Sequence, residues 1–185
     1  MISVNAFEKG LTIEVAGEIY RILEVEHVKP SKGSAFVQTK LQNLRTSESQ
    51  KMTFPVDEKV AKGQIIQREV QYLYGNGSSH VFMDTETYEQ VELPTKQIVV
   101  ELNYLLENSL CQLMLVGTET LGVILPKTVE LIVKETEPGI RGNTSGSSLK
   151  AALMNTGFIA QVPFFVNTDD KLLINTDDGS YVSRA

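Results

Sequence analysis

Residues 20–41 read YRILEVEHVKPSKGSAFVQTKL, and this stretch predicts two β-strands joined by a tight turn. In its second half, Val37 and Leu41 fall on one face while Gln38 and Lys40 fall on the other. A two-residue alternation is typical of a strand with one side on a core and the other side in water. The stretch therefore predicts a β-hairpin with one solvent-exposed face.

The turn between these two strands presents a lysine. Pro30 fixes its own φ and restricts the backbone of Lys29, and Gly33 can adopt the left-handed conformation that a sharp reversal needs. Lys32 is therefore expected to project outward from a stiff base. A lysine held in this way suits a narrow anionic cleft, and its amine is a common target of modification. Taken alone, the local physics favours an ordinary exposed hairpin lysine over such a role.

Alternation continues along the rest of the chain. Residues 128–135 (TVELIVKE) and 157–164 (GFIAQVPF) repeat it, and glycine-containing turns at 75–77 and 178–179 predict further hairpins. Helical spacing is confined to residues 96–108, where neighbouring β-branched residues limit the prediction to one short helix or helical turn. Many short strands with regular turns predict an all-β protein built from small barrels or sandwiches.

Two short joins divide the chain. They lie near residues 60–63 and 125–127 and give three parts, 1–63, 64–126 and 127–185. Each part has about 60 residues, which is near the lower size limit for a domain that folds alone. The last two parts are of similar size and strand rhythm, so they are expected to be related barrels.

Charge is distributed unevenly over these three parts. The net charge of the chain is −6, but residues 1–64 carry nine lysines and arginines against eight acids, whereas residues 65–126 carry two against eight. The excess acid is therefore confined to the middle of the chain, and the first part remains able to face a polyanion.

Cys111, the lone cysteine, lies in an apolar run and is predicted to be a small core residue. With no secretory leader and no apolar run of membrane-spanning length, we expect a cytoplasmic protein with no membrane partner.

The groups that an enzyme needs are not assembled in this sequence. His27 and His80 are isolated, and neither has ligands at metal-site spacing. His80 follows a turn and is predicted to lie on the surface of a strand. Residues 139–150 are rich in glycine and serine, but they lack the Gly-Lys-Ser/Thr ending of a phosphate loop. The sequence therefore predicts no catalytic residue, no metal site and no cofactor.

Six stretches, read in order, carry a more specific signal. They are MISVN at the start, KPSKGSAF at 29–36, VQYLY at 70–74, HVFMDTETYEQ at 80–90, LPKTVELIVKETEPGIRGNT at 125–144 and GSYVSR at 179–184. In this order and spacing they resemble the bacterial translation elongation factor P family over essentially the whole chain. The stretch from Thr128 to Thr144 is highly specific to that family, whereas the lysine turn alone is weak evidence.

This resemblance implies a fold and a function. The expected fold is an SH3-like barrel followed by two OB-fold barrels, arranged in an L shape similar to tRNA. The expected function is to bind the ribosome between the P and E sites, to reach the peptidyl-tRNA in the P site, and to promote peptide-bond formation at consecutive prolines. The ribosome supplies the chemistry, so the resemblance implies a monomeric accessory factor and not an enzyme.

The resemblance also assigns roles to residues. Lys32 takes the place of the loop-tip lysine, which in many members carries a post-translational group added by a modifying enzyme. The residues expected to support the loop and contact tRNA are Lys29, Pro30, Ser31, Gly33 and Ser34. Lys40 and Arg45 are expected to meet phosphates, and Tyr181 and Arg184 of the closing motif to contact RNA. A tyrosine that closes the barrel and a solvated arginine are the alternative for the last two.

Three departures from the family pattern qualify these roles. Ser31 stands where the loop commonly has glycine, and a serine held at positive φ would cost roughly 1 kcal/mol or reshape the tip. Asn143 stands where aspartate is common, and Ala151-Ala152 replace a stretch that is often Pro-Ala. The first departure bears on whether Lys32 is modified, because a modifying enzyme must read this loop.

Two other functions stay open. One is a divergent paralogue with the same fold and a different loop modification. The other is a generic OB-type module for single-stranded RNA, which would need a basic groove and exposed stacking aromatics. Aromatic residues make up only 7% of the chain, and Phe82 and Phe164 fall in core-like runs. The sequence therefore favours the translation factor over the generic RNA-binding module.

Overall fold

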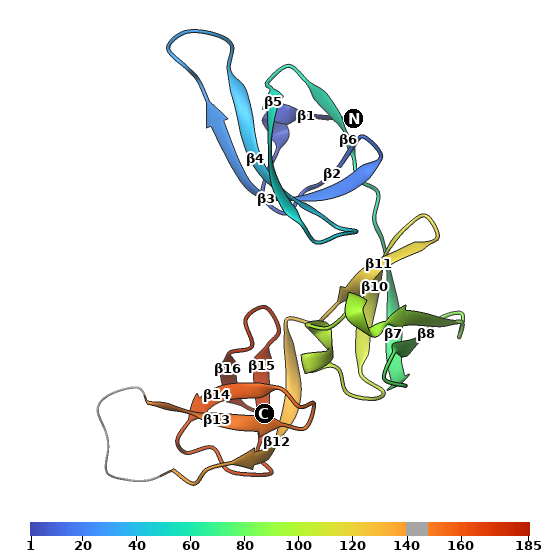
Figure 1. Cartoon of the computed structure of the whole chain (residues 1–185), viewed down its shortest axis with the longest axis vertical. Helices are drawn as coiled ribbons and strands as arrows, with labels where there is room; N and C mark the ends of the chain where they lie inside the picture. Colours follow the sequence, from blue (N-terminus) through green and yellow to red (C-terminus); the bar gives the residue numbers. More distant parts are fainter. Residues whose placement is uncertain (140–147) are drawn as a thin grey trace. The chain divides into compact units, whose positions relative to one another are not determined.

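The computed structural model describes residues 1–139 and 148–185, and strands account for nearly all of the regular structure in that part of the chain. No α-helix occurs among the described residues. The strands form three antiparallel sheets (Figure 1), which confirms the prediction of an all-β protein. Two predicted features, Asn143 and most of the Gly/Ser-rich segment, lie outside the described residues.

The first sheet has the strand order β1-β6-β2-β3-β4-β5. Its strands span Ile2–Ser3 (β1), Thr12–Val15 (β2), Glu18–Val28 (β3), Phe36–Asn43 (β4), Ser49–Pro55 (β5) and Lys59–Lys62 (β6), with a 3-10 turn at Val4–Ala6 (η1). The alternation predicted for β4 is confirmed, because Val37 and Leu41 are fully buried while Gln38 is exposed. Phe7 and Phe54 pack edge to face in the same core, with ring centroids 5.5 Å apart.

The second sheet has the order β11-β10-β7-β8-β9. Its strands span Ile66–Gly75 (β7), Ser79–Asp84 (β8), Gln90–Pro94 (β9), Leu110–Val116 (β10) and Glu119–Ile124 (β11). The predicted turn at residues 75–77 joins β7 to β8. Phe82 is completely buried, as predicted, and Cys111 is a buried free thiol, also as predicted.

The predicted helical segment, residues 96–108, forms short turns. Two 3-10 turns, Thr95–Gln97 (η2) and Glu101–Tyr104 (η3), take its place. Ile98 between them is fully buried, whereas Val99 and Val100 are exposed. The run of β-branched residues explains why no longer helix forms, because such side chains lose rotamer freedom against a preceding helical turn.

The third sheet has the order β14-β13-β12-β15-β16. Its strands span Thr128–Thr136 (β12), Leu149–Met154 (β13), Ile159–Pro163 (β14), Lys171–Asn175 (β15) and Tyr181–Arg184 (β16). Leu131, Val133, Ala160 and Val162 are buried on its inner side, which confirms the alternation expected for β12 and β14. Tyr104 from η3 joins the same core.

The chain divides into two compact units. One contains residues 1–66 with 115–121, and the other contains residues 67–114 with 122–185. The three sheets themselves occupy residues 2–62, 66–124 and 128–184. The division into three separate domains stays a prediction, because most of the second sheet shares one compact unit with the third.

Two predictions about individual side chains are wrong. His80 is only 8% exposed, and its Nδ1 lies 2.8 Å from the hydroxyl oxygen of Tyr72 in a hydrogen bond. Burial lowers the pKa of His80. Phe164 is 41% exposed and not part of a core, because β14 ends at Pro163 and the alternation stops there.

Candidate functional site

The lysine turn stands on a stalk of paired strands, in which β4 also pairs with β5 and one irregularity interrupts the β3–β4 pairing between Ile22 and Glu24. Strands β3 and β4 pair from Tyr20 opposite Asn43 up to Val28 opposite Phe36, which is the last pair before the loop. The Thr39 hydroxyl also donates a hydrogen bond to a main-chain oxygen of β5, at 2.9 Å. Figure 1 shows the loop extending beyond the body of this sheet. The stalk therefore gives the loop a rigid base.

Every residue from Lys29 to Ser34 is exposed. Gly33 has a φ of +99°, a backbone conformation that favours glycine. Ser31 is not among the residues with positive φ, so the condition for strain at this position is not met. Among the described residues, none forms a hydrogen bond or ion pair with Lys32. The structure thus places the loop residues together and leaves the amine of Lys32 unengaged by the described part of the chain.

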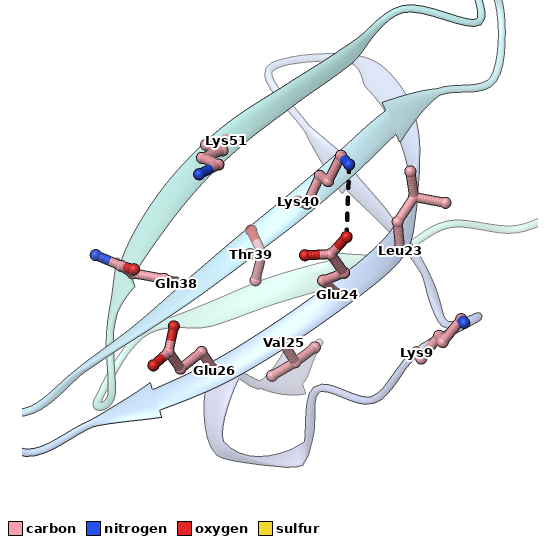
Figure 2. Close-up of a pocket in the computed structure, with 9 residues that line it drawn as sticks. All are labelled: Lys9, Leu23, Glu24, Val25, Glu26, Gln38, Thr39, Lys40 and Lys51. Atoms are coloured by element: carbon pink, nitrogen blue, oxygen red, sulfur yellow. Dashed lines mark hydrogen bonds and ion pairs between the residues drawn. The ribbon is translucent and has the colours of Figure 1, made fainter.

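A shallow hollow of about 620 Å³ lies along the stalk (Figure 2). Glu24, Lys40 and Lys51 form a row across its floor, because each lies opposite the next on adjacent strands. The Lys40 ammonium lies 3.4 Å from a carboxylate oxygen of Glu24. Lys9 and Glu26 also line the hollow. Lys40 and Lys51 lie directly opposite each other on neighbouring strands, where like charges repel. They form a positively charged pair beside the carboxylates.

Arg45 is engaged by two carboxylates. Its Nε and one Nη donate to both oxygens of Glu119, each at 2.9 Å, and the other Nη donates to Glu18 at 2.8 Å. The hydrogen bond to Glu119, with the charges of Glu119 and Glu18, raises the pKa of Arg45. The same hydrogen bond lowers the pKa of Glu119. A phosphate contact for Arg45 stays a prediction, and it would require an exchange of these partners.

Tyr181 and Arg184 come together with Phe165 on the third sheet. Tyr181 is partly buried against the core, and its ring meets the Phe165 ring edge to face at 6.4 Å. The Arg184 guanidinium lies over the same phenyl ring, 4.7 Å from its centroid. Sequence reasoning missed Phe165, because the sequence does not show that β14 ends at Pro163.

Two absences hold for residues 1–139 and 148–185. No group of three or more histidine, cysteine, aspartate or glutamate side chains there is placed to hold a metal ion. No helix there is long and apolar enough to cross a membrane.

Three sequence profiles of one family match this chain in succession. They describe the elongation factor P KOW-like domain at residues 3–60, its OB domain at 65–123 and its C-terminal part at 129–184. The chain belongs to the elongation factor P family. It is therefore a translation elongation factor, and membership of this family implies association with the ribosome.

Two solved structures are similar to this family member. The eukaryotic translation initiation factor 5A from Methanococcus jannaschii is 22% identical and has a TM-score of 0.53, with 68% of this chain and 92% of that chain covered. A translation initiation factor eif-5a family protein from Naegleria fowleri is 15% identical and has a TM-score of 0.49, with 67% and 96% covered. The first likeness supports the all-β architecture and says nothing of function.

Proposed function

We propose that this elongation factor binds the ribosome between the P and E sites and promotes peptide-bond formation at consecutive prolines. In this proposal Lys32 reaches the acceptor end of the P-site tRNA and positions it. The observation that carries the proposal is the geometry of the tip. Lys32 is exposed at the end of a paired stalk, and no hydrogen bond or ion pair joins it to the described residues.

The physical basis is orientation. Proline reacts slowly because its amine is secondary and its ring restricts approach to the ester. A cationic arm that orders the acceptor end lowers the barrier without taking part in bond making. Well-oriented groups gain up to about 7–11 kcal/mol in favourable cases, and a factor that steadies only one partner gains far less. The proposed factor therefore assists the ribosome and is not itself the catalyst.

Lysines near the tip supply the proposed contacts with the tRNA backbone. Lys29 is exposed beside the tip, and Lys40 lies in the hollow along the stalk. The Lys40 side chain is 42% exposed and its carboxylate partner Glu24 is 72% exposed, so water competes for this ion pair and a phosphate can replace it. Contacts of this kind give salt-dependent binding without base specificity.

The remaining partners belong to the same proposal. We expect a cytoplasmic monomer that meets the ribosome, the P-site peptidyl-tRNA and an enzyme that modifies Lys32. Such an enzyme needs a free amine on an accessible loop, and the exposure of residues 29–34 supports this expectation. The group that would be attached to Lys32 is a separate question, which the intact mass of protein from its native cells answers.

Reconstituted translation of a three-proline peptide tests the proposal. The wild type is expected to speed synthesis and Lys32→Ala to lose most of that effect, whereas Lys59→Ala, which removes another exposed lysine of the first sheet, is expected to keep it. Equal activity of the wild type and Lys32→Ala would contradict the role of the tip. If neither protein acts, the intact mass separates a missing modification from a paralogue with another task.

A further inference from the structure

The turn that follows β14 exposes two neighbouring phenylalanines. Val162 before the turn and Val166 after it are both fully buried, and the Val166 amide donates to the main-chain oxygen of Pro163 at 3.2 Å. Between these two anchors, both phenylalanines of the turn face outward. As a result, Phe164 is 41% exposed and Phe165 is 56% exposed. Contiguous exposed apolar surface can mark an interaction site, so this pair of rings is a candidate contact.

The ring of Phe165 is held in place by Arg184. The guanidinium lies 4.7 Å from the ring centroid, and one Nη donates to the main-chain oxygen of Phe165 at 2.8 Å. The same Nη lies 3.4 Å from a carboxylate oxygen of Asp170, and that oxygen also accepts from the Asn167 amide at 2.9 Å. The guanidinium of Arg184 is therefore held between Phe165 and Asp170, and the ring of Tyr181 meets the Phe165 ring edge to face.

The charges of Arg184 and Lys171 are offset by acidic partners, and β16 also exposes an apolar residue. Val182, two residues before Arg184, is 49% exposed. The charge of Arg184 is offset by Asp170, and Lys171 on the next strand pairs with Glu130 at 3.5 Å. An RNA surface would demand unpaired cations for its phosphates. Exposed aromatic residues beside a well-held arginine are instead the typical core of a protein–protein contact.

We propose that Phe165 is the residue by which the third sheet contacts a protein on the ribosome, inserting its ring into an apolar hollow of that partner. Arg184 is a positioning residue that holds the ring, and it does not itself carry the contact. The inference rests on the proposed ribosome binding. It differs from the expected RNA contact of Tyr181 and Arg184, because both side chains here serve the placement of Phe165.

Ribosome binding by single and double variants tests the two roles. Phe165→Ala is expected to raise the Kd about tenfold or more, as for a central aromatic contact. Arg184→Ala is expected to raise it less, and the double variant is expected to bind no worse than Phe165→Ala alone. Lys171→Ala, which removes a cation of the same sheet, is the matched control and is expected to bind as the wild type does.

Two results would overturn these assignments. Additive effects of Phe165→Ala and Arg184→Ala would show that Arg184 makes its own contact. An unchanged Kd for Phe165→Ala, with the wild type binding normally, would overturn the contact and leave the proposed function standing. Absence of wild-type binding would overturn both. Thermal unfolding of each variant shows whether the fold is kept, and the weaker substitution Phe165→Leu replaces Phe165→Ala where it is not.

Cross-linking decides the chemical class of the partner. Phe165 is replaced by the photoreactive p-benzoylphenylalanine, and the protein is irradiated on ribosomes. A cross-link to a ribosomal protein is expected, and adding Arg184→Ala should lower its yield because the ring is then no longer held. A cross-link to ribosomal RNA, or none at all, would overturn the proposal of a protein partner.

Discussion

Replacing Tyr72 by phenylalanine should destabilise the protein through a single hydrogen bond. Tyr72 is 7% exposed and His80 is 8% exposed, and the hydroxyl oxygen lies 2.8 Å from Nδ1 of the histidine. The substitution keeps the ring, which also packs on Phe82 with centroids 5.3 Å apart, so the loss of packing is small. What remains is a buried imidazole nitrogen without its partner.

The expected cost follows from that change. Leaving a buried polar group unpaired costs about 1–3 kcal/mol. In a protein of this size each kcal/mol lowers the Tm by about 2–4 °C, so Tyr72→Phe should lower the Tm by roughly 2–12 °C. Thermal unfolding followed by circular dichroism measures the shift.

Tyr74→Phe provides the matched control. Tyr74 lies two residues further along the same strand and is 49% exposed, so its hydroxyl faces water. Surface substitutions of this kind usually change stability by less than about 0.5 kcal/mol. If Tyr72→Phe and Tyr74→Phe shift the Tm equally, the hydrogen bond between Tyr72 and His80 does not stabilise the fold.

Three further predictions concern buried groups. Gly75→Ala should cost about 1–3 kcal/mol in urea unfolding, because its new Cβ would press on the His80 ring; an unchanged midpoint would mean that the ring moves aside freely. Burial lowers the pKa of His80 from 6.5, so the unfolded chain takes up a proton at a higher pH than the folded protein. The contribution of His80 to the free energy of unfolding should therefore be complete above about pH 6.5 and decrease below it. The variant His80→Gln should lose this pH dependence. A wild type that becomes more stable as the pH falls below about 6.5 would contradict the prediction. Burial also raises the pKa of Cys111 to about 12, so a thiol reagent should label this residue only after unfolding, and rapid labelling of the native protein would contradict its burial.

Local patterns explain what the sequence could predict. The stalk and its lysine tip depend on alternation, a proline and a glycine within a few residues, and all of these are visible in the chain. His80 was mispredicted because its burial depends on Tyr72, eight residues away across a hairpin. Phe164 was mispredicted because the alternation does not reveal that β14 ends at Pro163.

Long-range partners were beyond sequence reasoning. The sequence around Arg45 is typical of a free surface cation, yet its carboxylate partners lie 27 and 74 residues away along the chain. The hydrogen bond from Arg184 to the main-chain oxygen of Phe165 likewise joins residues 19 positions apart. Charge and strand rhythm limit which surfaces can meet RNA, but they do not show which cations are already paired.

The first compact unit is not one continuous piece of the gene. Residues 115–121 belong to it, and two of them, Val116 and Gly117, line a hollow together with Ile19 and Ala61. A fragment that stops at residue 66 would lack these residues and would leave Arg45 with only one of its two carboxylates. A chimaera that takes this unit from a relative must therefore take both segments, residues 1–66 and 115–121, from the same relative. Only then are Arg45 and Glu119 kept together.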